Sequence, residues 1–352
     1  MNNPTHYKVV EADLVKDRSD IIALWGRNLS GPYEARYEWM YRDNSHIPSM
    51  TWLLKTASCV TVGATGLSYR RMKIGDQMRL VGHAVDLCVD RKYRSLGPAI
   101  KLQKAITGSF QDKGMSLIYG FPNILSEKVL LRVGYRTLGP LERWTKILRC
   151  EYIINRYRKG NALLKILSFP IDKALTLLSR ELHRRNSSDI RIDVLDNFDE
   201  RFDHLWETAS SQYGTIGERT ASYLNWRFKQ CPHKSYEVFC LFDREDVLQG
   251  YIIYHIKKTE KKVIIADILA REPAFLHKLL RRFVHRMRFA GFTSITMFCC
   301  GTPTLKEKLK SSGFHKRQGQ GLVLVYFGDK DPRIQYYLDE NPFYITVADA
   351  DF

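Results

Sequence analysis

The chain has 352 residues and a formal net charge of +17, with 44% hydrophobic and 26% charged residues. This composition is typical of a soluble globular protein, and the length suits two domains of about 150 residues each. The longest apolar runs are strand-sized, which excludes a membrane-spanning helix, and the first residues lack the apolar core of a signal peptide. We therefore expect a cytoplasmic protein, with peripheral contact at the inner membrane face as the alternative.

The first half of the chain predicts an α/β fold. Alternating strands follow an early helical pattern, and a more apolar strand then leads into a helix that ends at Gly114. Antiparallel strands followed by alternating strands and helices indicate a mixed, mostly antiparallel sheet flanked by helices. The predicted elements are strands at 51–59, 60–69 and 83–89, a helix at 96–113, a strand at 116–119, a helix at 125–132 and a final strand.

Five landmarks of the first half recur in the second half, in the same order and at an offset of about 180 residues. This repetition predicts two tandem domains of one fold, at 1–148 and 189–352, joined by a linker at 149–188. The paired landmarks are Leu24-Trp25 with Leu205-Trp206, 37–41 with 223–228, Gly63 with Gly250, 85–87 with 266–268, and Gly134-Tyr135 with Gly313-Phe314.

The linker is basic and amphipathic. Its apolar residues recur at helical spacing between lysines and arginines, and Pro170 is expected to divide it into two helices. Two interpretations stay open. The linker either packs its apolar stripe on the two domains, or lies on an anionic membrane as a basic amphipathic helix does.

The most informative segment leaves the strand 83–89 and enters a helix through Arg94-x-x-Gly97-x-Ala99. Glycine lets the backbone approach a phosphate closely, and free N–H groups at a helix N-terminus face the anion. After the next strand comes Asn123-x-x-Ser126-x-x-x-Leu130-x-Arg132-x-Gly134-Tyr135. Together these patterns resemble the GNAT (Gcn5-related N-acetyltransferase) family, in which a phosphate loop Arg/Gln-x-x-Gly-x-Gly/Ala is followed by Asn-x-x-Ala-x-x-x-Tyr-x-Lys-x-Gly-Phe.

The resemblance implies an acyl-CoA co-substrate, acetyl-CoA in the first instance. It also implies transfer of the acyl group to an amine of a small molecule or amino sugar by direct attack. The main chain of 87–89 would polarise the thioester carbonyl. Asn123 would bind the pantetheine arm, although it is equally suited to cap a helix. The implied cofactor-binding residues are Leu87, Cys88, Val89, Arg94, Ser95, Leu96, Gly97, Pro98, Ala99, Asn123 and Ser126.

The catalytic groups are less well defined. Asp86, on the strand beside the thioester, is the candidate general base, with His83 as a weaker second. Asp267 repeats its position in the second half, which favours a structural role for both aspartates. The tyrosine that protonates the departing thiolate in the family is Leu130 here. Tyr119 is therefore the candidate proton donor, with Ser126 and Tyr135 as alternatives.

The second half lacks the phosphate loop, because 271–275 contains no glycine and Thr302 stands at the asparagine position. We expect it to be structural or to shape the acceptor pocket. Two other functions stay open: an acyltransferase that uses an acyl carrier protein or aminoacyl-tRNA as donor, and a non-catalytic binding protein. The positive charge would suit either acidic donor. The seven cysteines show no metal-ligand spacing, so no metal is expected, and nucleic acid is not an expected partner.

Overall fold

The computed structural model describes residues 7–43, 49–150, 152, 172, 190–328 and 343–350. The predicted linker at 149–188 lies almost wholly outside these residues, so neither interpretation of it is tested. Within the described part of the chain, no helix is long and apolar enough to span a membrane.

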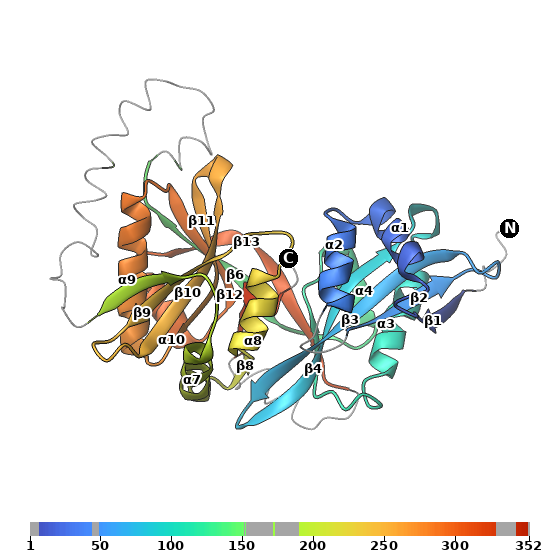
Figure 1. Ribbon diagram of the computed structural model, residues 1–352. Helices are drawn as coiled ribbons and strands as arrows, with labels where there is room; N and C mark the ends of the chain where they lie inside the picture. The colour runs from blue at the N-terminus through green and yellow to red at the C-terminus, as the bar shows by residue number, and fades with distance from the viewer. Residues whose placement is uncertain are drawn as a thin grey trace, which may run out of the picture.

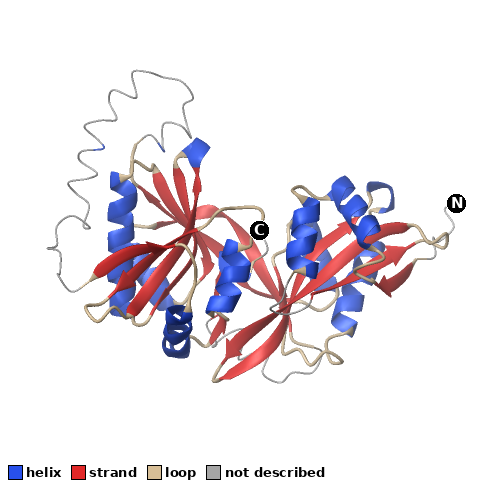
Figure 2. Ribbon diagram, in the orientation of Figure 1, coloured by secondary structure: helices blue, strands red, loops and turns tan. Residues whose placement is uncertain are grey.

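The elements of the first half follow the predicted order (Figures 1 and 2). The apolar strand begins earlier than predicted, at Gln77, because it forms a long hairpin with the strand before it. The first-half elements are β1 (Lys8–Glu11), α1 (Arg18–Asn28), α2 (Tyr33–Tyr37), the π-helical η1 (Glu38–Arg42), β2 (Ser49–Lys55), β3 (Thr61–Ile74), β4 (Gln77–Val89), η2 (Arg91–Tyr93), α3 (Leu96–Gly108), β5 (Ile118–Gly120), α4 (Ile124–Arg132) and β6 (Arg136–Ile147).

The second half contains a similar series of elements and ends in a short strand and a single helical turn. These elements are β7 (Arg191–Leu195), α7 (Glu200–Ala209), η3 (Ser210–Gln212), β8 (Thr215–Gly217), α8 (Ala221–Leu224), the π-helical η4 (Asn225–Lys229), β9 (Glu237–Phe242), β10 (Leu248–Lys257), η5 (Lys258–Glu260), β11 (Lys262–Ala270), α9 (Pro273–Phe289), β12 (Ser294–Cys300), α10 (Pro303–Ser311), β13 (His315–Tyr326), β14 (Phe343–Thr346) and η6 (Val347–Asp349).

The strands of the described residues belong to one mixed sheet, in the order β1-β2-β3-β4-β5-β13-β6-β12-β11-β10-β9-β7, with β8 and β14 off this path. One long strand of each half, β6 and β13, pairs with a strand of the other half. β6 pairs with β12, β13 pairs with β5, and β6 and β13 pair with each other. The mixed α/β sheet is therefore confirmed, but its halves are joined by exchanged strands, which the sequence does not indicate.

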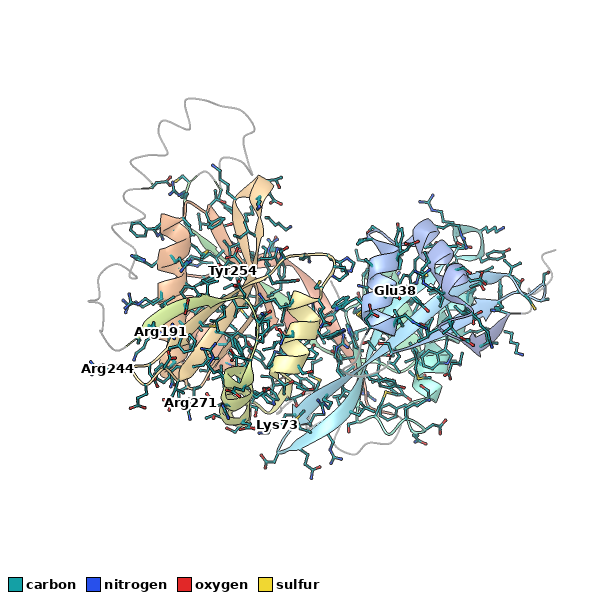
Figure 3. All side chains as sticks on the ribbon, viewed as in Figure 1. Glu38, Lys73, Arg191, Arg244, Tyr254 and Arg271 are labelled. Carbon is teal, nitrogen blue, oxygen red and sulfur yellow. The ribbon has the colours of Figure 1, made fainter. Side chains whose placement is uncertain are left out.

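Eight strands close into a ring. β8 pairs with β3 on one side and with β14 on the other, and β14 pairs with β12, so the path β3-β4-β5-β13-β6-β12-β14-β8 returns to β3. A cluster of buried apolar side chains comes from these strands, including Met72, Leu141, Val325 and Ile345. Lys73 lies near the tip of the β3–β4 hairpin (Figure 3). Its ammonium donates a hydrogen bond to the hydroxyl of Ser210 in the second half.

Helices cover both faces of the first-half sheet. Leu53 and Leu54 are neighbours on β2 and point to opposite faces. Leu53 packs in the cluster that contains α1, whereas Leu54 packs in the cluster that contains α3. On the α1 face the two π-helical turns meet. The Trp39 and Trp226 rings stack at 5.1 Å, and each indole N–H donates to the main-chain carbonyl of the other residue.

Candidate functional site

A wedge opens between β4 and β5. These parallel strands pair only at Gly82 with Ile118 and at His83 with Tyr119, after which they diverge. A cavity of about 250 Å³ lies beyond this point. It brings together four of the predicted site residues, which come from different elements. Its lining is Leu29, Ala84, Val85, Asp86, Leu87, Gln103, Phe121, Pro122, Asn123, Ser126 and Leu130.

The wedge depends on a β-bulge at Asp86. The register between β3 and β4 shifts between Ala64 and Gly66, and Asp86 has a φ of 53°, a left-handed value that is unfavourable for a residue with a side chain. Such a conformation persists only where surrounding contacts hold it. The bulge turns β4 away from β5, so this residue shapes the cavity through the backbone.

The contacts that hold the bulge come from the helix α2 and the π-turn that follows it. Arg36 donates to Oδ1 of Asp86 from Nε at 3.0 Å and from Nη2 at 2.8 Å, and the Tyr41 hydroxyl donates to Oδ2 at 2.8 Å. Burial, and then the Asp86 charge, raise the pKa of Tyr41 well above its usual value, so its hydroxyl stays protonated. Gly66 leaves room for this contact, because a Cβ there would lie 2.0 Å from the Tyr41 hydroxyl oxygen.

Asp86, the candidate general base, therefore lines the cavity, but its carboxylate is engaged by structural partners. The sequence analysis missed Arg36 and did not predict the hydrogen bond between Tyr41 and Asp86. No spacing or periodicity links positions so far apart in the chain. The only available signal was the charged residue itself within an apolar strand.

The N-terminus of α3 is open to solvent. Ser95 is the N-cap residue, and its side chain makes no capping hydrogen bond. Residues 94–97 are exposed, and a Cβ added at Gly97 would meet no atom within 4 Å. The first N–H groups of this helix of 13 residues are thus available to an anion, as the phosphate-loop motif predicts.

The loop that leads into α3 is fixed to α1. Arg94 donates to the Val89 carbonyl oxygen and to Oδ1 of Asn28, while Asp90 accepts from Arg27 and Asn28. Burial alone would raise the pKa of Asp90, but the hydrogen bonds from Arg27 and Asn28 outweigh it and lower the pKa. In this structure Arg94 therefore stabilises the loop. The sequence analysis missed the supporting residues on α1.

Some of the predicted cofactor-binding residues have buried side chains, so only their main-chain groups could contact the cofactor. Cys88 and Val89 are buried in apolar clusters on opposite faces of the sheet. Burial raises the pKa of the Cys88 thiol to about 12, so it is not a nucleophile near neutral pH. Pro98 is buried and Ala99 half-buried at the start of α3, while Leu96 is exposed beside the open helix end.

Asn123 and Ser126 form a capping box at the start of α4. Oδ1 of Asn123 accepts from the N–H groups of Leu125 and Ser126, and Oγ of Ser126 accepts from the Asn123 N–H at 2.9 Å. The cap uses only Oδ1, which leaves the Asn123 amide nitrogen able to donate to a ligand in the cavity. Both predicted roles of Asn123 are compatible with this arrangement. Leu130 also lines the cavity and supplies no polar group.

Tyr119, the candidate proton donor, is not brought into the cavity. Its hydroxyl is buried and donates to the main-chain oxygen of Asp349 at 2.8 Å. Its ring stacks on His83 at 4.7 Å and contacts Phe121 edge-on, and of these three only Phe121 lines the cavity. The strand pattern could not show this, because the contact at Asp349 comes from the far end of the chain.

The equivalent region of the second half is unsuited to a phosphate. A cavity of about 430 Å³ lies at the starts of α9 and α10. There Glu272 is the N-cap residue and Pro273 begins the helix, so a carboxylate stands where an anion would bind. Asp267 is fully buried and bonds to Arg219, Tyr251 and Thr346, a structural network in the position that corresponds to Asp86.

Comparisons with known proteins bear on the fold. No protein-family model matches the sequence, and no curated protein matches it. Among solved structures, a GCN5-related N-acetyltransferase from Anabaena variabilis ATCC 29413 is similar with a TM-score of 0.65 and 13% identity, over 92% of this chain and 73% of that one. A GCN5-related N-acetyltransferase from Kribbella flavida is similar with a TM-score of 0.60 and 12% identity, over 92% and 72%.

N-myristoyltransferase from Saccharomyces cerevisiae, solved with bound myristoyl-CoA, is also similar, with a TM-score of 0.58 and 10% identity over 94% of this chain and 85% of that one. At these identities the likeness shows the fold. The chain has the fold shared by GCN5-related N-acetyltransferases and N-myristoyltransferases, which confirms the resemblance seen in its sequence motifs.

Proposed function

We propose that this protein is an acyl-CoA-dependent acyltransferase whose co-substrate binds in the first half. The observation that carries this proposal is the wedge between β4 and β5, with Asn123 and Leu87 in its lining and the open N-terminus of α3 following β4. The wedge accepts the thioester and pantetheine arm, and the free N–H groups at 96–99 accept the pyrophosphate. The fold supports this proposal, since its known members named above are acetyl- and myristoyltransferases.

The proposed reaction is direct transfer. The acceptor amine attacks the thioester carbonyl carbon, the carbon–sulfur bond breaks, and the sulfur leaves with the electron pair as a thiolate. Main-chain N–H groups at the bulge, 87–89, stabilise the negative oxygen of the tetrahedral intermediate. The nitrogen loses its proton to water and the thiolate takes one from water, with hydrogen bonds from the Asn123 amide or the Ser126 hydroxyl reducing the charge on sulfur. Asp86 acts as a positioning residue in this scheme.

The acyl group is short in this proposal. The cavity of about 250 Å³ is bounded by Phe121 and Leu130, and it must also admit the end of the pantetheine arm. Acetyl is therefore favoured over a long chain, and an amine of a small molecule or amino sugar is the proposed acceptor. The myristoyl-CoA of the yeast structure belongs to that protein alone.

We also infer that the two halves are tandem copies of one domain, at 1–148 and 189–352. The two π-helical turns, with Trp39 and Trp226 stacked at their contact, support this inference. Asn123 caps the start of α4 with its side chain, and Thr302 caps the start of α10 in the corresponding position of the second half. Only the first copy keeps the phosphate-binding helix end, so the second stabilises the sheet and contributes the surroundings of the acceptor.

Calorimetric binding of acetyl-CoA to the wild type and to Gly97→Glu tests the proposed function. The added carboxylate would stand in open space at the proposed phosphate site, so we expect at least about thirtyfold weaker binding with an unchanged fold. Gly108→Glu is the matched control, because Gly108 lies in open space near the end of the same helix. It should bind acetyl-CoA like the wild type.

A long-chain acyl-CoA in the same experiment tests the size of the acyl group, and we expect weaker binding than for acetyl-CoA. Wild-type protein that binds neither thioester would contradict the proposed function and would favour a carrier-protein or tRNA donor. Binding without any turnover of the thioester across amine acceptors would favour the non-catalytic alternative.

A further inference from the structure

A second cavity, of about 410 Å³, lies on one face of the second-half sheet. It is separate from the acyl-CoA wedge, with which it shares no lining residue. Alternate residues of four neighbouring strands form its floor, so its shape is set by a rigid sheet. The lining is Arg143 and Thr145 on β6, Thr296 and Phe298 on β12, Lys262 and Ile264 on β11, His255 and Lys257 on β10, together with Tyr152, Lys234, Glu260 and Val347.

Positive charge dominates this cavity. Of its lining residues in the described part of the chain, four are cationic and Glu260 alone carries a carboxylate. Glu260 pairs with Lys262 and, at 3.8 Å, with Lys257. Among the residues that the structure describes, Arg143 and Lys234 have no carboxylate partner. Within the described ranges, two cations therefore face the cavity without a compensating carboxylate, an arrangement that favours binding of an anion.

The electrostatic surroundings of Lys234 and His255 agree with this excess of charge. Burial lowers the pKa of Lys234, and the neighbouring Arg227 lowers it further. Burial, followed by the charges of Lys234 and Lys257, lowers the pKa of His255 to about 4. The imidazole is thus neutral near pH 7. It can donate one hydrogen bond to a ligand and accept another without adding charge to the cavity.

Neutral hydrogen-bonding groups complete the lining. The hydroxyl groups of Thr145 and Thr296 lie 3.1 Å apart and bond to each other across β6 and β12. The Lys262 ammonium lies 5.2 Å from the centre of the Tyr152 ring. Cations and hydroxyls that converge in one cavity match the many acceptor oxygens of a phosphate, whereas a single carboxylate would satisfy fewer of them.

We propose that this basic cavity is a binding site for a phosphate-bearing ligand, with Arg143 and Lys234 as its principal anchors. Arg143 and Lys234, which have no carboxylate partner among the described residues, lie next to the two lysines that share Glu260. Together they suit a ligand with at least about two negative charges, such as a diphosphate. The site lies apart from the proposed acyl-CoA loop, so its existence does not depend on the proposed function.

Calorimetric titration with inorganic pyrophosphate tests this site. The experiment is done in the Gly97→Glu background, so that the N-terminus of α3 does not contribute. We expect one binding event that is weakened about tenfold by Lys234→Gln, about tenfold by Arg143→Gln, and further by both together. Binding should also weaken as the salt concentration rises.

The matched control is Lys310→Gln, which removes the same charge from an exposed position on α10, outside the cavity. It should leave pyrophosphate binding unchanged. Arg143→Lys keeps the charge and should retain most of the binding, which separates loss of the site from loss of the fold. Thermal unfolding of each variant provides a second check on the fold.

The phosphate could come from a soluble diphosphate or from a lipid head group, and a parallel experiment separates the two. Sedimentation with phosphatidate vesicles that depends on Lys234 and Arg143, without pyrophosphate binding, would assign the site to a lipid phosphate. Pyrophosphate binding alone would assign it to a soluble ligand. Absence of both, or binding that is unaffected by the double substitution, would overturn the proposal.

Discussion

At the scale of single residues, Asp86 illustrates how a polar side chain can shape a site through the backbone. Its side chain is 5% exposed, and its contacts with Arg36 and Tyr41 hold a left-handed backbone conformation. The sequence assigned Asp86 and Leu87 to one site, and both line the cavity, because strand and motif spacing fix positions along one element. It could not show that Asp86 pairs with Arg36, since contacts between distant segments leave no local pattern.

The positioning role of Asp86 can be measured. We expect Asp86→Asn to lower the free energy of unfolding by roughly 2–3 kcal/mol, because it leaves Arg36 largely buried without its counter-charge. It should also weaken acetyl-CoA binding, since the bulge that opens the wedge loses its support. Urea unfolding and calorimetry measure the two effects.

Tyr41→Phe is the companion variant, because it removes one hydrogen bond to Asp86 and no charge. It should change stability and binding in the same direction by a smaller amount, about 1 kcal/mol. The opposite result would be an Asp86→Asn protein with unchanged stability and acetyl-CoA affinity but a large loss of turnover. That result would restore Asp86 as the general base.

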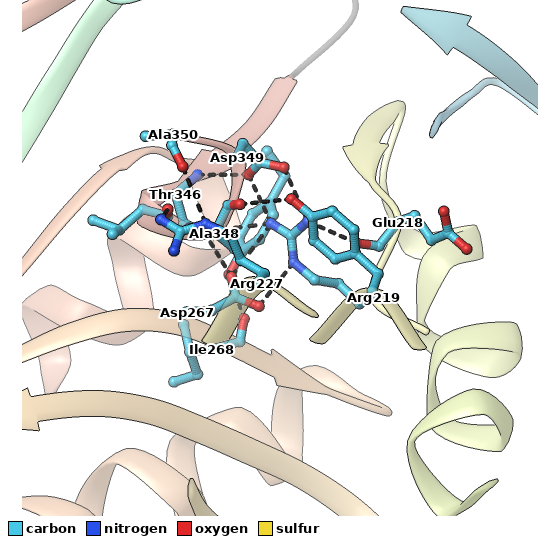
Figure 4. Close-up of polar contacts among 12 residues, drawn as sticks. Glu218, Arg219, Arg227, Asp267, Ile268, Thr346, Ala348, Asp349 and Ala350 are labelled. Atoms are coloured by element: carbon cyan, nitrogen blue, oxygen red, sulfur yellow. Dashed lines mark hydrogen bonds and ion pairs between the residues drawn. The ribbon is translucent and has the colours of Figure 1, made fainter. Parts of the chain in front are cut away.

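At the scale of elements, the terminal strand β14 and the turn η6 are fastened to the second half by a buried polar network (Figure 4). Arg219, which is fully buried, bonds to both Asp267 and Asp349. The Tyr223 hydroxyl donates to the Ala348 carbonyl oxygen, and Arg227 donates to the carbonyl oxygens of neighbouring tail residues. These hydrogen bonds and ion pairs make the short segment 343–350 part of the core.

Asp349→Asn should loosen this segment, because it removes a buried charge partner of Arg219. We expect a loss of about 3 kcal/mol in the free energy of unfolding. Hydrogen exchange at 343–350 should increase in the same variant. Asp246→Asn is the control, since its pair with Arg191 is on the surface, and we expect a change of less than about 0.5 kcal/mol. Unchanged exchange in Asp349→Asn would show that β14 is held by its strand pairing alone.

Element positions were largely predictable, but strand partners were not. The predicted helices at 96–113 and 125–132 correspond to α3 and α4, and the predicted strands to β2, β3, β4 and β5. Hydrophobic periodicity reports the type of an element and its buried face. It does not indicate which strands pair with each other. The pairing of β6 and β13 with strands of the other half, and the closure of the ring by β8 and β14, are therefore not predictable from it.

At the scale of the whole molecule, the closed ring couples the two halves. Its strands come from both halves of the chain, and β6 and β13 each pair with strands of the other half, so neither half can complete its sheet alone. We therefore expect one cooperative unfolding transition rather than two. Far-UV circular dichroism and tryptophan fluorescence should give coincident urea curves, because Trp25, Trp144 and Trp226 report on different parts of one unit. Two separated transitions would show that the halves are independent.

The exchanged strands also set an order of events during synthesis on the ribosome. β6 leaves the ribosome early, but its partners β12 and β13 follow late, with β13 ending about 180 residues after β6. At common rates of elongation this is a delay of roughly 10 to 40 seconds, far longer than a strand pair needs to form. Both edges of β6 lack their final partners until β12 emerges, and one edge still lacks its partner until β13 follows. The nascent chain thus carries an incompletely paired strand through about half of its own translation.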